Sequence, residues 1–167
     1  MQDAYHSANH DRFPSLARLL GIPFMNIHGP LDEIGRRLMQ QQADRACGGT
    51  VGDVMDALAG LPELASGHTR VQLGAGSCHH PAGRVVVAHG CLTHGGYAVA
   101  DTYFRHGVST VVYIHCSQPD VERLAGEGRG NLIITGHIAS DLLGINPFLQ
   151  VLREAGLEVV ALDGAGG

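Results

Sequence analysis

Short apolar runs alternate with amphipathic segments along the second half of the chain. Four Val- and Ile-rich runs each predict a buried strand, at residues 84–89, 110–115, 132–137 and 157–162. Three segments with helical periodicity separate them, at residues 97–106, 119–125 and 141–155. Strands that alternate with helices in this way are typical of βαβ units, and continuously apolar strands are covered on both faces. We therefore expect a three-layer α/β/α fold with a largely parallel or mixed sheet.

The first half of the chain predicts helices around one further strand. The expected helices cover residues 7–20, 32–43 and 50–64. The run IPFMNIH at residues 22–28 is interpreted as a strand that ends in His28 and is followed by a turn. Thr50 and Asp53 have the spacing of a capping box. A short strand is expected at residues 70–73.

These patterns divide the chain into three parts of one domain. A first α/β segment covers residues 1–64, a loop-rich connection covers 65–83, and a second α/β segment covers 84–167. The total of 167 residues suits a single domain with a substantial core.

Composition excludes two classes of function. The formal net charge is −5, and all 11 basic residues are arginines scattered along the chain, which argues against nucleic-acid binding. No apolar run approaches the roughly 18 residues that a membrane span requires. The first twelve residues lack the apolar core of a signal peptide, so a cytoplasmic location is expected. The four cysteines form no C-x2-C pair and are expected to be free thiols.

Two segments place a histidine four residues before an aspartate. They are His28 with Asp32 and His137 with Asp141, and each histidine ends a predicted strand. In the second segment we expect Ser140 to cap the helix that Asp141 opens. Because ligands bind outside the carboxyl ends of strands in α/β sheets, both pairs could share one site. Imidazole and carboxylate suit zinc, manganese or iron. The alternative is that each aspartate caps a helix and each histidine is an ordinary surface or core residue.

Other polar residues follow the strands between these segments. His89, Cys91 and His94 lie close enough in sequence to bind a structural zinc, or they simply form the loop before a helix. His94 could also line the cleft without binding metal. His115 could orient a metal ligand by a hydrogen bond, or belong to a polar loop.

The two His-Asp segments, IPFMNIHGPLDE and NLIITGHIASD, resemble the metal-ligand motifs of the NGG-interacting-factor-three (Nif-three) family. The strand–helix units that begin with RVVVAH and TVVYIH also fit its second half. The resemblance implies a three-layer α/β fold, a dinuclear metal centre in a cleft and a homohexameric ring. It matches Asp32 and His137 to metal ligands, His28 to the histidine before the first aspartate, and Asp141 to a bridging glutamate.

The chain departs from the family pattern in two respects. Asp141 is one methylene shorter than the glutamate it replaces. The family's His-His-Pro segment is absent before His28, although His79-His80-Pro81 spells it downstream. We interpret the chain as the later two-thirds of a family member, in which the histidine-pair half of the site is absent. The metal would then be mononuclear, weakly bound or lost.

These observations lead to three functional hypotheses. The first is a metal-dependent hydrolase of an unidentified small molecule, with the metal on Asp32, His137 and Asp141. The second is a non-enzymatic, oligomeric binding or metal-carrier module with an incomplete metal site. The third is a domain stabilised by zinc at the segment from His89 to His94.

Overall fold

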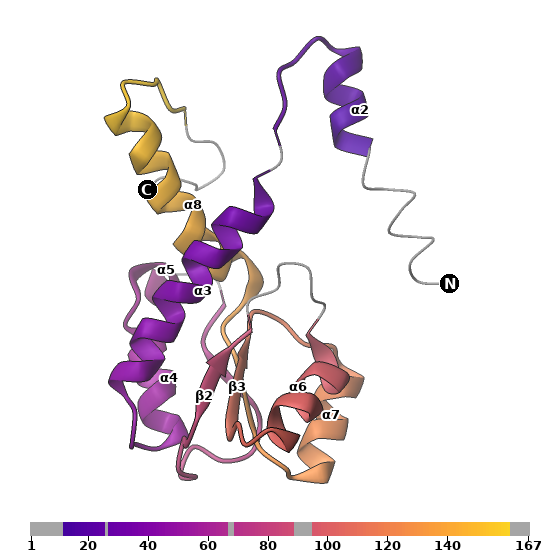
Figure 1. Cartoon of the computed structure of the whole chain (residues 1–167), viewed down its shortest axis with the longest axis vertical. Coiled ribbons are helices and arrows are strands. Elements are labelled where there is room, and N and C mark those ends of the chain that lie inside the picture. Colours follow the sequence, from indigo (N-terminus) through magenta and orange to yellow (C-terminus); the bar gives the residue numbers. More distant parts are fainter. Residues whose placement is uncertain (1–11, 26, 67–68, 89–94, 161–167) are drawn as a thin grey trace.

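The computed structural model describes residues 12–25, 27–66, 69–88 and 95–160 of the chain (Figure 1). Seven helices and four strands are described. In chain order they are α2 (Arg12–Leu19), α3 (His28–Arg45), α4 (Val51–Ala59), α5 (Pro62–Ser66), β1 (Gln72–Ala75), β2 (Val85–Val87), α6 (Gly96–Arg105), β3 (Thr110–Tyr113), α7 (Gln118–Glu127), β4 (Asn131–Ile134) and α8 (His137–Glu154).

The four strands form one mixed sheet in the order β1-β4-β3-β2. Strands β2, β3 and β4 are parallel, and β1 runs antiparallel to β4. Every residue of β3 is buried, because this strand lies inside the sheet and has helices on both faces. The prediction of a largely parallel or mixed sheet is therefore confirmed.

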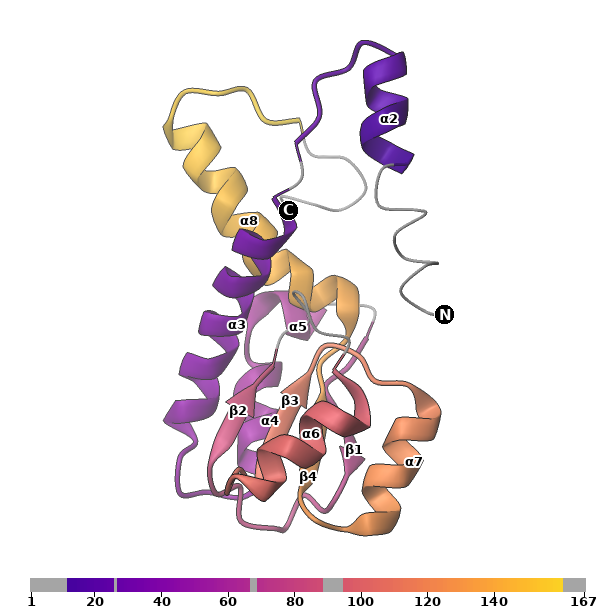
Figure 2. The same cartoon turned by 45° about the vertical axis from the view of Figure 1, so that its right-hand side comes forward.

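Helices cover the two faces of the sheet in two groups. Helices α6 and α7 lie on one face, and α3, α4, α5 and α8 lie on the other (Figures 1 and 2). The side chains of β3 alternate accordingly: Val111 packs in the α6–α7 core and Val112 in the core beneath α3 and α8. The three-layer α/β/α prediction is thus confirmed.

The outer edge of β2 is covered by a side chain from α3. The amide of Gln40 donates to the carbonyl of Val85 at 3.1 Å and accepts from the backbone N–H of Val87 at 2.9 Å. The primary amide therefore makes the two hydrogen bonds that a neighbouring strand would make.

The prediction of a strand at residues 22–28 is wrong. Residues 22–25 and 27 form no strand, Asn26 lies outside the described residues, and α3 already begins at His28. No strand of the described sheet pairs with this segment, so its apolar residues add no backbone hydrogen bonds to the sheet. Ile22, Phe24 and Met25 are instead 55%, 52% and 72% exposed. Figure 1 shows α2 and the following segment projecting from the rest of the molecule.

Several predicted boundaries also change. The helix predicted at 50–64 is divided into α4 and α5, because Gly60 ends α4 and Pro62 begins the next helix. The predicted strand at 70–73 lies two residues later, as β1. Residues 157–160 form no strand, and the rest of the predicted strand at 157–162 lies outside the described residues. The predicted helix at 7–20 is described only from residue 12, as α2.

The second half of the chain follows the predicted order. Strands β2, β3 and β4 and helices α6 and α7 overlap the predicted segments, whereas α8 begins at His137 and not at the predicted residue 141. The capping box of Thr50 and Asp53 is also confirmed: the Asp53 carboxylate accepts from the backbone N–H of Thr50 at 2.7 Å, and the Thr50 hydroxyl accepts from that of Asp53. No helix among the described residues is long and apolar enough to cross a membrane.

Candidate functional site

Both His-Asp pairs lie at the beginning of a helix, one helical turn apart within each pair. His28 is the first residue of α3, and its Nε2 is 3.3 Å from Oδ1 of Asp32. His137 is the first residue of α8, and its Nε2 is 3.4 Å from Oδ2 of Asp141. The i,i+4 spacing places each imidazole beside its carboxylate on one helix face. The predicted partnership within each pair is therefore present, although His28 follows no strand among the described residues.

The first turn of α8 differs from the prediction. Ser140 is not the helix cap, because the helix begins three residues earlier, after Gly136 at φ 94°. Ser140 and Thr135 are both fully buried, and their hydroxyl oxygens are 2.7 Å apart. The Ser140 hydroxyl donates to the carbonyl of Gly136. Ser140 therefore ties the helix start to the end of β4, next to His137 and Asp141.

Helices α3 and α8 are in close contact next to both pairs. Gly144 is three residues beyond Asp141, and its Cα lies against the carbonyl of Leu31, the neighbour of Asp32. Any Cβ at position 144 would clash with that backbone. The missing side chain thus allows contact between the helix turns that carry the two aspartates. Sequence analysis did not identify Gly144, although a glycine inside a helical pattern often marks close packing.

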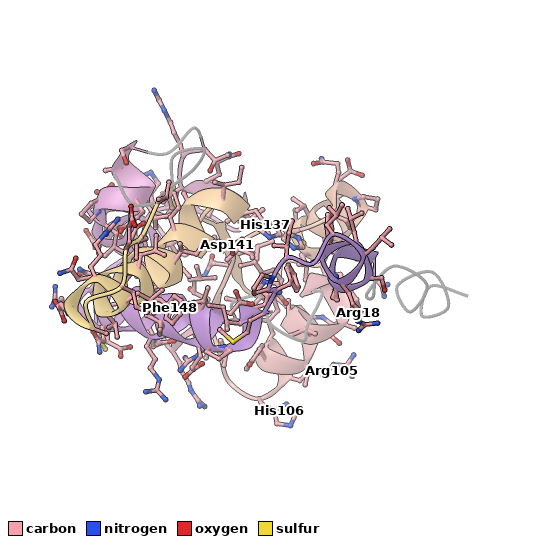
Figure 3. All side chains as sticks on the ribbon, turned by 90° about the horizontal axis from the view of Figure 1, so that it is seen from above. Arg18, Arg105, His106, His137, Asp141 and Phe148 are labelled. Carbon is pink, nitrogen blue, oxygen red and sulfur yellow. The ribbon has the colours of Figure 1, made fainter. Side chains whose placement is uncertain are left out.

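His115 joins the second pair through its ring. It follows β3, and β3 and β4 are parallel neighbours with Tyr113 opposite Ile134. The rings of His115 and His137 are stacked, with centroids 4.9 Å apart and an interplanar angle of 14°. Figure 3 looks down on this end of the molecule and shows His137 and Asp141 side by side on α8. His115 thus lies beside a candidate ligand, and its predicted role in orienting a metal ligand stays a prediction.

A carboxylate of the chain lies at the beginning of α6. The Asp120 carboxylate lies against Gly96, at the beginning of α6, and accepts from the Ser117 hydroxyl at 2.8 Å. Burial raises the pKa of the nearby Cys116 thiol, and the charge of Asp120 raises it further. Cys116 is therefore held as a neutral thiol, a poor nucleophile. The three described cysteines, Cys47, Cys78 and Cys116, are free.

Of two other predicted groups, one lies outside the described residues and the other lies away from the His-Asp pairs. His89, Cys91 and His94 lie outside the described residues, so the zinc hypothesis and the position of His94 stay predictions. His80 lies at the opposite end of the strands, where its Nδ1 is 2.9 Å from Oδ1 of Asn131. Asn131 begins β4, whereas His137 follows its end. The His79-His80 segment therefore does not supply the histidine pair of the family pattern to this edge.

The donor types at the start of α3 and α8 fit a divalent metal of borderline hardness. Each helix supplies one imidazole nitrogen and one carboxylate beside it. Across the described ranges, however, no group of three or more His, Cys, Asp or Glu side chains is gathered closely enough to hold a metal ion. The described residues thus provide two pairs of donors and not a three-ligand cluster.

The fold and the paired donors at one sheet edge define a three-layer α/β protein with a candidate metal site. Among solved structures, the chain is similar to a NIF3 superfamily protein from Sphaerobacter thermophilus, with 53% sequence identity and a TM-score of 0.88. The match covers 95% of this chain and 60% of that one. The chain belongs to the NIF3 superfamily. Searches against protein-family models and against curated proteins gave no match.

Proposed function

We propose that this NIF3-like chain binds a divalent metal ion, namely zinc, manganese or iron, through His28, Asp32, His137 and Asp141. We further propose that it acts as a metal-dependent hydrolase on a small molecule, with the cytoplasm as its location. One observation carries the metal proposal. The helix turns bearing the two His-Asp pairs are in contact, through the close approach of Gly144 to Leu31.

The residues of the chain would divide the work in this site. A bound metal would supply Lewis acidity and a water of lowered pKa. Asp32 is 3% exposed and Asp141 is 28% exposed, so the second carboxylate is more accessible to a substrate. The stacked ring of His115 restricts rotation of His137, which favours one orientation of its nitrogen atoms.

Metal binding is tested by elemental analysis and by calorimetric titration with zinc and manganese. We expect Asp32→Asn and Asp141→Asn each to weaken metal affinity at least about tenfold, because each removes a charged donor. Asp56→Asn is the matched control, since Asp56 is exposed on α4 and remote from both pairs. Affinities that are equal in all three variants and in the parent would refute the site.

The alternative is an oligomeric binding or metal-carrier module without turnover. It is favoured by the lack of a three-donor cluster in the described part of the chain. A carrier would release metal rapidly to a chelator. It would hydrolyse neither phosphate esters nor amides at a saturating metal concentration. Metal-dependent hydrolysis that Asp141→Asn abolishes would decide for the enzyme.

We also propose that the chain forms a homo-oligomer, with the hexamer of the family resemblance as the expected state. The support is the apolar surface of α2, where Phe13, Leu16 and Leu19 are 68%, 50% and 82% exposed. Light scattering after gel filtration measures the mass. Leu19→Glu should reduce it, whereas Arg18→Glu on the same helix should change it less. A parent protein that is monomeric at every concentration would contradict the proposal.

A further inference from the structure

A cavity of about 780 Å³ lies at the end of the sheet where β3 and β4 begin, opposite the end where His137 follows β4. It is bordered by the starts of β3 and β4, the ends of α6 and α7 and the loop after β1. Its polar lining includes Ser77, His80, Ser109 and Arg129, and its apolar lining includes Phe104. The volume is within the range of small-molecule sites.

The hydrogen bonds of Asn131 fix the orientation and the tautomer of His80. Asn131 is 4% exposed, and its Nδ2 donates to the carbonyl of Ser109 at 3.1 Å. Because a carbonyl only accepts, the amide nitrogen must lie on that side and Oδ1 must face His80. The Nδ1 of His80 therefore carries a proton and donates to Asn131. Its Nε2 points the other way and has no partner among the described residues.

Three arginines and two carboxylates form an alternating chain that reaches the cavity through Arg129. Asp101 binds both Arg105, at 2.7 Å, and Arg129, at 2.6 Å. Glu127 binds both Arg129 and Arg123, each at 3.3 Å. Three guanidinium groups thus face two carboxylates. The surplus also offsets the partial negative charge at the ends of α6 and α7.

Hydrogen-bond donors with remaining capacity meet at this cavity. Arg129 uses Nη1 for Asp101 and Nε for Glu127, which leaves Nη2 without a partner in the described part of the chain. The hydroxyl of Ser109 makes no hydrogen bond there either. A phosphate group could accept hydrogen bonds from both of these groups. A proton between another phosphate oxygen and Nε2 of His80 would form a third hydrogen bond.

We propose that this cavity binds a small organic phosphate, with the phosphate on Arg129, Ser109 and His80 and an apolar, planar body against Phe104. The phosphate matches the hydrogen-bond donors, and the body matches the aromatic and glycine-rich lining. The site is independent of the metal proposal, because β4 separates it from His137.

The test is an NMR titration of the full chain with phenyl phosphate, with inorganic phosphate and phenol as the two half-ligands. Phenyl phosphate should bind more tightly than either half and should shift signals of the cavity residues. His80→Asn keeps a donor for Asn131 but removes Nε2, and should weaken binding about three- to tenfold. Arg129→Gln should weaken it at least as much, and Asp101 retains Arg105 in that variant.

Matched controls distinguish binding in this cavity from binding elsewhere on the protein. His79→Asn alters the exposed neighbour that does not line the cavity, and should leave the affinity unchanged. Asp32→Asn should also leave it unchanged, which separates the cavity from phosphate held at a metal. Phenol binding as tightly as phenyl phosphate, equal affinities in His80→Asn and the parent, or no shift at the cavity would each overturn the proposal.

Discussion

The two His-Asp pairs share one spacing but are held by different structures. Asp32 is 3% exposed at the start of a helix that no described strand precedes, whereas Asp141 is 28% exposed in the helix that follows β4. The α8 pair is fixed by a short turn from the sheet, by the buried hydroxyl of Ser140 and by the stacked ring of His115. The described residues 22–25 before the α3 pair are exposed and belong to no helix or strand.

This difference shows that the i,i+4 spacing on a helix aligns each pair, while the surroundings determine how firmly the pair is placed. The α8 pair is positioned locally by β4. The α3 pair depends on packing against α8, next to Gly144 and Leu31. Three variants test this contrast.

The largest effect is expected from Gly144→Val. The added side chain would strike the carbonyl of Leu31 and separate α3 from α8. We expect a loss of about 3 kcal/mol in the free energy of unfolding, measured by denaturant titration. Gly126→Ala in α7 is the control, because a Cβ there meets nothing within 4 Å. It should stabilise the protein by about 0.5–1 kcal/mol. A Gly144→Val protein as stable as the parent would show that the two helices are not in close contact.

An intermediate effect is expected from Ser140→Ala. The change leaves the buried hydroxyl of Thr135 without its neighbour and should cost about 1 kcal/mol. Hydrogen exchange should accelerate in the first turn of α8 and remain unchanged in that of α3. Equal acceleration in both helices would contradict local positioning of the α8 pair.

The smallest effect concerns Glu33, beside Asp32 on α3. Hydrogen bonds from Arg36 and then Arg37 lower its pKa from 4.5 to about 2. Since the folded pKa is below the unfolded one, the stabilisation is present above pH 4.5 and is lost as the pH falls toward 2. Glu33→Gln should therefore flatten the pH dependence of stability in that window. Glu122→Gln on α7 is the control. A parent and a Glu33→Gln variant with the same acid profile would argue against the shift.

Periodicity predicted β2, β3 and β4 of the second half, because each of these strands pairs with a neighbour and the sheet has helices on both faces, but it also predicted a last strand that residues 157–160 do not form. The same reasoning failed at residues 22–28. An apolar run indicates that its side chains are suited to burial, but it does not indicate that a neighbouring strand is present to pair with it. Ile22 and Met25 have none in the described sheet and remain exposed.

The sequence identified the residues of the candidate site but not the contacts that hold them in place. The H-x3-D spacing identified both pairs, and the position of His115 at the end of a predicted strand made it a candidate neighbour. Gly144 and the Ser140–Thr135 contact were missed, because they depend on how two helices and a strand end meet in space. Whether a metal binds there remains a prediction of the resemblance and the donor chemistry.

The amide of Gln40 has a consequence for how copies of this chain can associate. It occupies the backbone groups of Val85 and Val87 on the outer edge of β2. An incoming strand would first have to displace this side chain, so that edge resists extension of the sheet and the fibrous growth that such extension starts. Association of copies is therefore directed to side-chain surfaces such as that of α2.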